Sequence, residues 1–138
     1  MESYFGTSIN ESPTIVLPAA EKIENAQAIA LVIKEGGVGK PGAAGDMPIG
    51  LTLRAAEETY EKGNDVTIQV KDIGKWTAGE AIAIGDLLTA NAEGKAVKAA
   101  AGNFIMAIAL TATENPGTMI QVQIIKAGYV AAAAGSKD

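Results

Sequence analysis

The chain has 138 residues, with 11 basic and 16 acidic side chains and a net charge of −5. This length fits one domain or at most two very small ones. The chain contains no His and no Cys, which excludes histidine-based catalysis, thiol nucleophiles, disulfides and the usual zinc sites. Its acidic pI near 4.7 argues against a nucleic-acid partner, which would need a basic face.

The N-terminal segment predicts an arm outside the main core. Residues 1–13 are polar, with Tyr4, Phe5 and Ile9 as isolated apolar side chains. The segment lacks a cationic start followed by an apolar run, so we expect no export signal. No later stretch approaches the ~20 apolar residues that span a bilayer, so we expect no membrane partner.

Five segments have the patterns of β-strands. Residues 66–70 and 120–124 alternate apolar and polar side chains, which is typical of a strand buried on one face. Residues 28–33 and 105–110 are continuous apolar runs that suit strands covered on both faces. Residues 14–17 form a shorter strand candidate closed by a proline. Short strands separated by glycine-rich turns predict an all-β fold, a small β-barrel or β-sandwich.

One segment is ambiguous between helix and loop. Residues 55–62 contain good helix formers and are followed by Gly63, a common C-terminal stop. A polar loop fits the same residues, and both interpretations stay open.

The middle of the chain repeats itself. Residues 44–53 align with residues 101–110 at an offset of 57, and the same offset pairs Gly37 with Gly94. Chance matching of small residues is the alternative to duplication. The predicted organisation is an arm, one β domain with two similar strand units, and a flexible tail: residues 1–18, 19–130 (units at about 19–71 and 76–125) and 131–138.

A glycine-rich stretch invites a nucleotide-binding interpretation. Residues 37–42 match G-x-G-x-x-G, but a dinucleotide site needs a helix to begin there, and Pro41 interrupts the segment. A phosphate loop would need Ser or Thr after Lys40. We expect a flexible connection between strands and no cofactor.

The acidic residues predict neither a metal site nor an acid–base pair. Glu57 and Glu58 are adjacent, so on a helix they would point in different directions. Four aspartates lie beside glycines or in turns without the alternating carboxylates of a calcium loop: Asp46, Asp65, Asp72 and Asp86. We expect no metal and no enzyme activity.

The single tryptophan, Trp76, lies at the junction of the two predicted units. Filling the core or the seam is the simpler interpretation. The other is an interface anchor, because Trp is enriched at binding hot spots.

The second unit contains four motifs in order: a glycine–aspartate element that opens a strand, a Gly-Lys turn, a small-residue strand and a closing Val/Gln strand (residues 77–89, 93–99, 105–110 and 117–124). This order resembles the tailed-phage capsid decoration, or cement, proteins. The resemblance covers residues 77–125, and residues 20–70 repeat it weakly.

The resemblance implies a non-enzymatic β-rich virion protein, made in the host cytoplasm, that binds the outer surface of the phage head. Its partners would be the major capsid protein and further copies of itself, as in a homotrimer. The arm, residues 1–18, would engage the capsid with Tyr4 and Phe5 as anchors, and Ile9 and Trp76 complete the candidate interface residues. The apparent duplication and the insertion at residues 55–63 depart from the simplest members.

Two alternatives remain. A head-fibre base or other virion appendage would occupy a few vertices and not the whole lattice. A small carbohydrate-binding module would need exposed aromatic residues, for which Trp76 and Tyr60 are the candidates.

Overall fold

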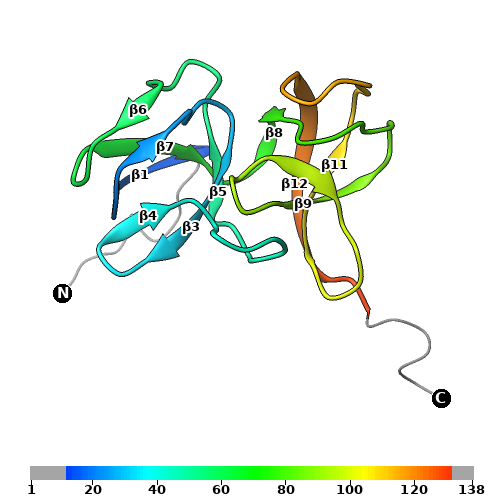
Figure 1. Ribbon diagram of the computed structural model, residues 1–138, viewed down its shortest axis with the longest axis horizontal. Helices are drawn as coiled ribbons and strands as arrows, with labels where there is room; N and C mark the ends of the chain where they lie inside the picture. The colour runs from blue at the N-terminus through cyan, green and yellow to red at the C-terminus, as the bar shows by residue number, and fades with distance from the viewer. Residues whose placement is uncertain (1–11, 132–138) are drawn as a thin grey trace.

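The computed structural model describes residues 12–131, and within that range every regular element is a β-strand. Figure 1 shows two β units side by side, the first built from the N-terminal half and the second from the C-terminal half. The strands form two five-stranded sheets and one two-stranded ribbon, which confirms the predicted all-β class with sandwich-like sheets. No helix long and apolar enough to cross a membrane occurs in the described range.

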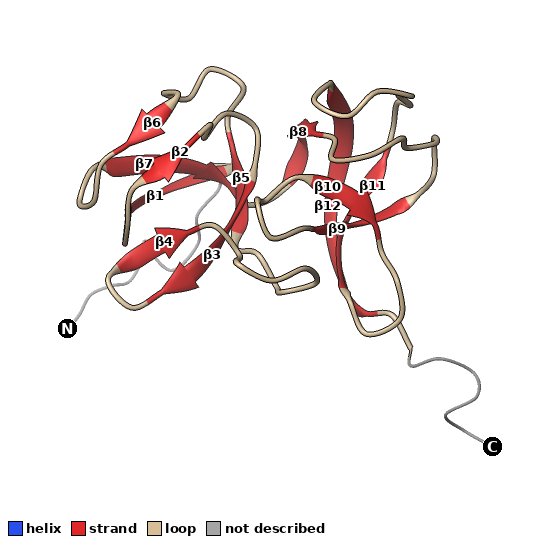
Figure 2. Cartoon of the chain, viewed as in Figure 1, coloured by secondary structure: helices blue, strands red, loops and turns tan. Residues whose placement is uncertain are grey.

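The described part of the chain forms twelve strands in two units, and Figure 2 shows their arrangement. The first unit contains β1 (Thr14–Pro18), β2 (Ile23–Glu24), β3 (Ala30–Lys34), β4 (Gly37–Gly39), β5 (Gly50–Thr52), β6 (Thr59–Tyr60) and β7 (Asp65–Gln69). The second contains β8 (Asp72–Thr77), β9 (Leu87–Ala90), β10 (Ala96–Lys98), β11 (Phe104–Ala109) and β12 (Met119–Tyr129).

The two units have the same topology. The first sheet has the order β1-β7-β5-β3-β4, and the second, read from its other edge, has the order β8-β12-β11-β9-β10. In each unit one parallel bridge joins the two edges of the sheet, Ala19 to Val38 in the first and Ala78 to Ala96 in the second. Each sheet therefore curls toward a barrel at one point without closing a continuous ladder. Two similar strand units follow one another, as the repeat in the sequence predicts.

The alternating segments form strands with one buried face. In β7, Val66 and Ile68 are fully buried, while the residues between and beside them remain accessible. In β12, Val122 and its neighbours two positions away are buried in the same way. Successive side chains of a strand point to opposite faces, so the period of two places one set in the core.

Each unit has its own core, and the second core extends across the junction. Ile23, Leu31 and Val66 belong to the core of the first unit. The core of the second unit also includes Ala30 and Leu51, which come from β3 and β5 of the first. This shared packing fixes the two units against one another.

Residues 55–62, whose sequence fits either a helix or a loop, form a loop that contains the short strand β6. The chain turns at residues 54–58, and β6 then pairs with β2 through Ile23 and Tyr60. Tyr60 is only 8% exposed, and its hydroxyl accepts the Glu57 N–H at 3.2 Å. Burying this ring requires the strand pairing, which overrides the helix propensity of the preceding residues.

The glycine-rich connection is held against the second unit. Residues 37–39 form β4 beside β3, so no helix begins at the G-x-G-x-x-G match. The Gly42 and Gly45 N–H groups donate to the carbonyls of Ala92 and Ala90 at 3.1 and 2.9 Å. The stretch does connect strands, as expected, but hydrogen bonds to the second unit anchor its C-terminal part.

Candidate binding surfaces

The predicted arm is only partly within the described residues. Tyr4, Phe5 and Ile9 lie outside them. Residues 14–18, which the sequence assigns to the arm, form β1 and pair with β7 along its length. The Pro13 carbonyl also accepts the Val70 N–H at 2.8 Å. Residues 14–18 therefore belong to the folded first unit and not to an arm.

Trp76 lies inside the second core with no exposed surface. Its indole N–H donates to the Gly94 carbonyl at 2.8 Å, and the same carbonyl accepts the Ala30 N–H at 2.8 Å. The ring thus joins a turn of the second unit to a strand of the first. This position supports the core-filling interpretation of Trp76. With Tyr60 also buried, neither aromatic proposed for glycan binding reaches the surface.

The acidic residues hold local structure. Asp86 accepts the Ala83 N–H at 2.9 Å and closes a turn, and Asp72 has a φ of 73° where the chain passes between the units. Glu57 and Glu58 are exposed. Among residues 12–131, no group of three or more His, Cys, Asp or Glu side chains lies close enough to hold a metal ion. The described carboxylates thus have structural roles or face solvent.

Lys126 is the one described group with a clear pKa shift. Partial burial lowers the pKa of its ammonium group, because the charged form loses hydration. Its Nζ donates to the Ile49 carbonyl at 2.7 Å, which links β12 to the first unit. Its φ of 45° is left-handed. The contact is therefore part of the junction between the units.

An apolar row crosses the outer face of the second sheet, and we call it the outer row. The pairing of β8, β12, β11 and β9 brings Ile73, Gln123, Ile108 and Leu87 into line. Ile73 and Leu87 are 51% and 44% exposed, and Ile125 extends the row along β12. Because directly paired residues point to the same face of a sheet, these side chains share one outer face, on which the polar Gln123 lies between Ile73 and Ile108.

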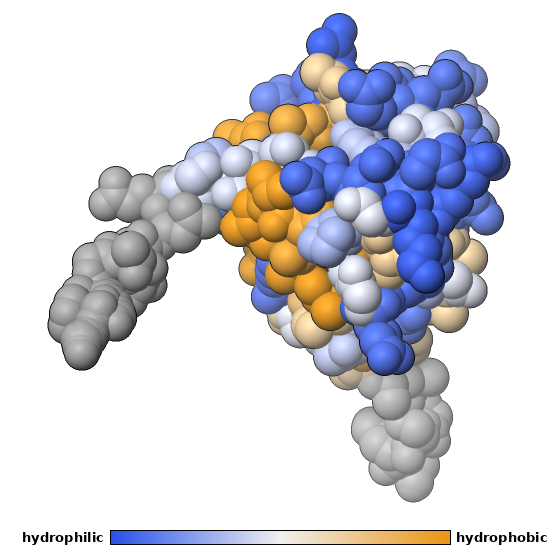
Figure 3. Space-filling model, turned by 90° about the vertical axis from the view of Figure 1, so that its left-hand side faces the viewer, coloured by the Kyte–Doolittle hydropathy of each residue, from blue (hydrophilic) through white to orange (hydrophobic). Residues whose placement is uncertain are grey.

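A second apolar patch lies on the first unit. Val16 of β1 and Ile33 of β3 are 56% and 59% exposed. Figure 3 views this end of the molecule and shows apolar side chains gathered beside a strongly hydrophilic surface. The molecule therefore presents two separate apolar surfaces, one on each unit.

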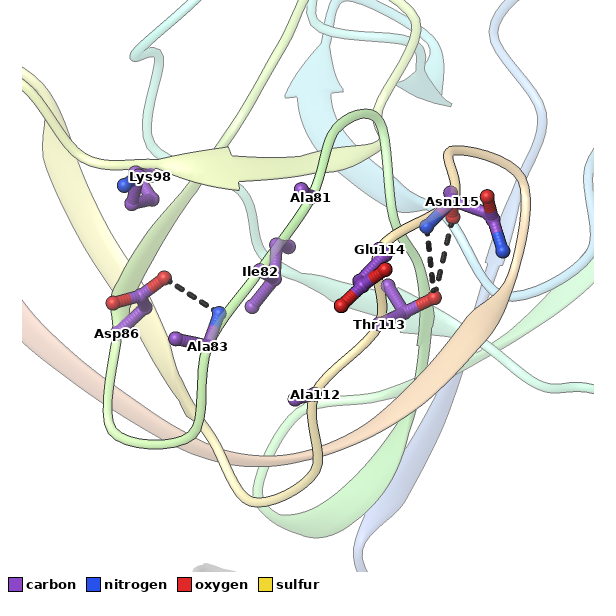
Figure 4. Close-up of a pocket in the computed structure, with 9 residues that line it drawn as sticks. All are labelled: Ala81, Ile82, Ala83, Asp86, Lys98, Ala112, Thr113, Glu114 and Asn115. Carbon is purple, nitrogen blue, oxygen red and sulfur yellow. Dashed lines mark hydrogen bonds between the residues drawn. The ribbon is translucent and has the colours of Figure 1, made fainter.

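A hollow of about 720 Å³ opens between two loops of the second unit (Figure 4). Ile82 is buried beneath it, and Thr113 stands opposite, its hydroxyl accepting the Asn115 N–H at 3.2 Å. Small and polar side chains complete the lining: Ala81, Ala83, Asp86, Lys98, Ala112, Glu114 and Asn115. The hollow has an apolar floor and a polar rim.

Neither the outer row nor the hollow is predicted from the sequence. The alternation of residues 120–124 indicates an outer face of β12, but only the register with three other strands places Ile73, Ile108 and Leu87 in one row with Gln123. The hollow lies beside Thr113, which pairs with Ile82 as Tyr60 pairs with Ile23 in the first unit. An alignment of the two units that places the small Thr113 against the large Tyr60 is the sequence signal for the hollow.

Comparisons with known proteins are consistent with this architecture. The sequence profile of the phage cement protein family matches residues 9–124. A search of curated proteins finds no match. Among solved structures, the N base of head fiber gp8.5 of bacteriophage phi29 matches with a TM-score of 0.60 and 18% identity, over 83% of this chain and 95% of that chain. At that identity the likeness concerns the fold alone.

Proposed function

The chain belongs to the phage cement protein family, and from this membership we propose that it binds the major capsid protein on the outer surface of the head. The family match over residues 9–124 is the observation that carries the proposal. We also propose that the protein forms a homotrimer. Its binding would stabilise the shell against the pressure of the packaged DNA.

The outer row is the surface we propose for the capsid contact. Its large apolar residues come from strands of one sheet, so they keep their spacing without ordering on binding. Gln123 and the neighbouring Lys75 and Gln121 supply polar groups on the same face. Apolar contact area combined with polar groups on the same face is usual at protein interfaces. Many copies on a lattice make modest affinity per contact sufficient.

The absence of enzyme activity is part of the same proposal. The support is chemical: the chain has no His or Cys, and its described carboxylates cap turns, form ion pairs such as Glu21 with Lys34, or face solvent. A cement protein needs a rigid surface and no reactive group.

Reconstitution on heads tests the proposal. Purified protein is mixed with heads that lack it, and the particles are imaged by electron cryomicroscopy. We expect added density over the outer lattice and greater resistance of the decorated heads to heat or chelator. Heads that show no added density at saturating protein would contradict the proposal.

A head-fibre base is the second candidate, and the fold shared with the phi29 head fiber base favours it. The same images separate the two functions. Density at every equivalent lattice site supports a cement protein, whereas a few copies confined to vertices support a fibre base.

A further inference from the structure

The outer row of the second unit has a counterpart on the first unit. The two sheets share one strand order, so β1, β7, β5 and β3 correspond to β8, β12, β11 and β9. Strand pairing aligns four residues across the first sheet, which we call the junction row: Ala30, Leu51, Gln69 and Thr14. The corresponding places in the second sheet belong to the outer row: Leu87, Ile108, Gln123 and Ile73. A glutamine therefore stands at the third place of both rows.

The junction row is occupied by a strand of the second unit. Ala30 and Leu51 have no exposed surface and belong to the second core. The Gln69 amide donates from Nε2 to the carbonyls of Lys71 and Ile73 at 2.9 and 2.8 Å, where the chain enters β8. β5 and β8 lie beside each other at the junction (Figure 1). The junction row thus holds β8 through apolar contact and through a glutamine that bonds to the backbone.

The close approach of β8 to Gln69 leaves no room for a side chain. A Cβ added to Gly74 would lie 2.6 Å from the Gln69 Oε1 atom. The Thr77 N–H donates to the Ala28 carbonyl at 2.8 Å, which fixes the other end of β8 on the first unit. A strand that binds a row of this type therefore presents accessible backbone groups and a glycine beside the glutamine.

The outer row offers the same arrangement to a partner. Gln123 is exposed, and Ile73 and Leu87 are 51% and 44% exposed. We infer that the outer row binds the edge of a β-strand of the major capsid protein, with the Gln123 amide donating to backbone carbonyls of that strand. The inference rests on the proposed function, and it names the structure that the capsid protein presents to this site.

A second copy of the chain is the alternative source of a strand edge, and two residues argue against it. β1 is the counterpart of β8 and an edge strand of its sheet. Ile15 stands in β1 where β8 has Gly74, so its side chain would fill the space that the glutamine needs. Pro18 stands in the place of Thr77 and has no N–H to donate. The edge of β1 therefore lacks both features by which β8 binds the junction row, which favours the capsid protein.

The role of the Gln123 amide can be tested against a neighbouring glutamine. Gln123→Glu keeps the length of the side chain and removes its N–H donors, so we expect binding to heads to weaken at least about tenfold. Gln121→Glu makes the same change two residues earlier on the same face of β12, and it should leave binding within about threefold. Co-sedimentation with heads measures both affinities, and melting temperatures verify that both variants fold. Equal losses in the two variants, or no loss in Gln123→Glu, would overturn the inference.

A reconstruction of decorated heads at side-chain resolution provides the direct test. We expect the outer row over the edge of a capsid-protein strand, with Gln123 Nε2 within hydrogen-bond distance of two backbone carbonyls. A capsid helix or loop beneath the row, a second copy of the chain there, or a row that faces solvent would overturn the inference and leave the proposed function intact. Heads without added density would contradict the proposed function and this inference with it.

Discussion

Gly94 is the residue at which the junction tolerates no side chain. Its φ is +87°, and a Cβ there would lie 2.6 Å from the Ala30 carbonyl oxygen. Gly117 has a φ of +90°, and no atom lies within 4 Å of the place where an added Cβ would stand. Gly117→Ala therefore measures the free-energy cost of the backbone conformation alone. We expect Gly117→Ala to lower the free energy of unfolding by about 1 kcal/mol and Gly94→Ala by about 3 kcal/mol. Urea titrations measure both, and equal losses would contradict a tight approach at Gly94.

Lys126 gives the stability of the junction a pH dependence. Burial lowers the pKa of Lys126 in the folded chain below its ordinary 10.5. The unfolded chain keeps this proton to higher pH, so between the two pKa values it binds more protons than the folded chain. Stability therefore rises with pH in that window, and the burial penalty is fully present below the folded pKa. Denaturant titrations of the wild type and Lys126→Met between pH 8 and about 10.5 should show this rise only in the wild type. Parallel curves would contradict it.

The outer row can be tested as one element against the patch on the first unit. Ile73→Thr with Leu87→Thr keeps β-branched or strand-compatible side chains and removes apolar surface from the row. Val16→Thr with Ile33→Thr makes a similar change on the first unit at comparable exposure. We expect the first pair to weaken binding to heads at least tenfold and the second to leave it within about twofold. Co-sedimentation with heads measures both affinities, and the reverse ranking would transfer the capsid contact to the first unit.

The elements predicted from the sequence are those whose pattern is local. Residues 66–70 and 120–124 carry their own alternation, and β7 and β12 form there. β2 and β6 are two residues each and exist only because Ile23 pairs with Tyr60, far along the chain. No window of residues contains that signal. Because residues 55–62 include β6, whose pairing partner lies far away in the sequence, their own residues cannot decide between helix and loop.

At the scale of the whole molecule, the sequence repeat predicts the topology of the two units, whereas no sequence pattern predicts which side chains form the surfaces. Like topology in the two units follows from like strand patterns, which a sequence displays. Surfaces depend on register: Ile73, Ile108 and Leu87 belong to three strands and meet only in the folded sheet. Trp76 follows the same rule, because the Gly94 carbonyl that accepts its indole N–H lies 18 positions away in the sequence.

Two truncations locate the boundary between arm and fold. Deleting residues 1–11 keeps β1 and the Pro13–Val70 hydrogen bond, so the melting temperature should change by no more than a few degrees. Attachment to heads or self-association should weaken, because Tyr4 and Phe5 are lost. Deleting residues 1–18 also removes β1, exposes the edge of β7 and uncovers the core beneath Leu17, so we expect a loss of several kcal/mol. Differential scanning calorimetry and head binding separate the two effects. An unfolded 1–11 deletion would mean that the N-terminal segment belongs to the core and that binding and folding cannot be assigned to different parts of this chain.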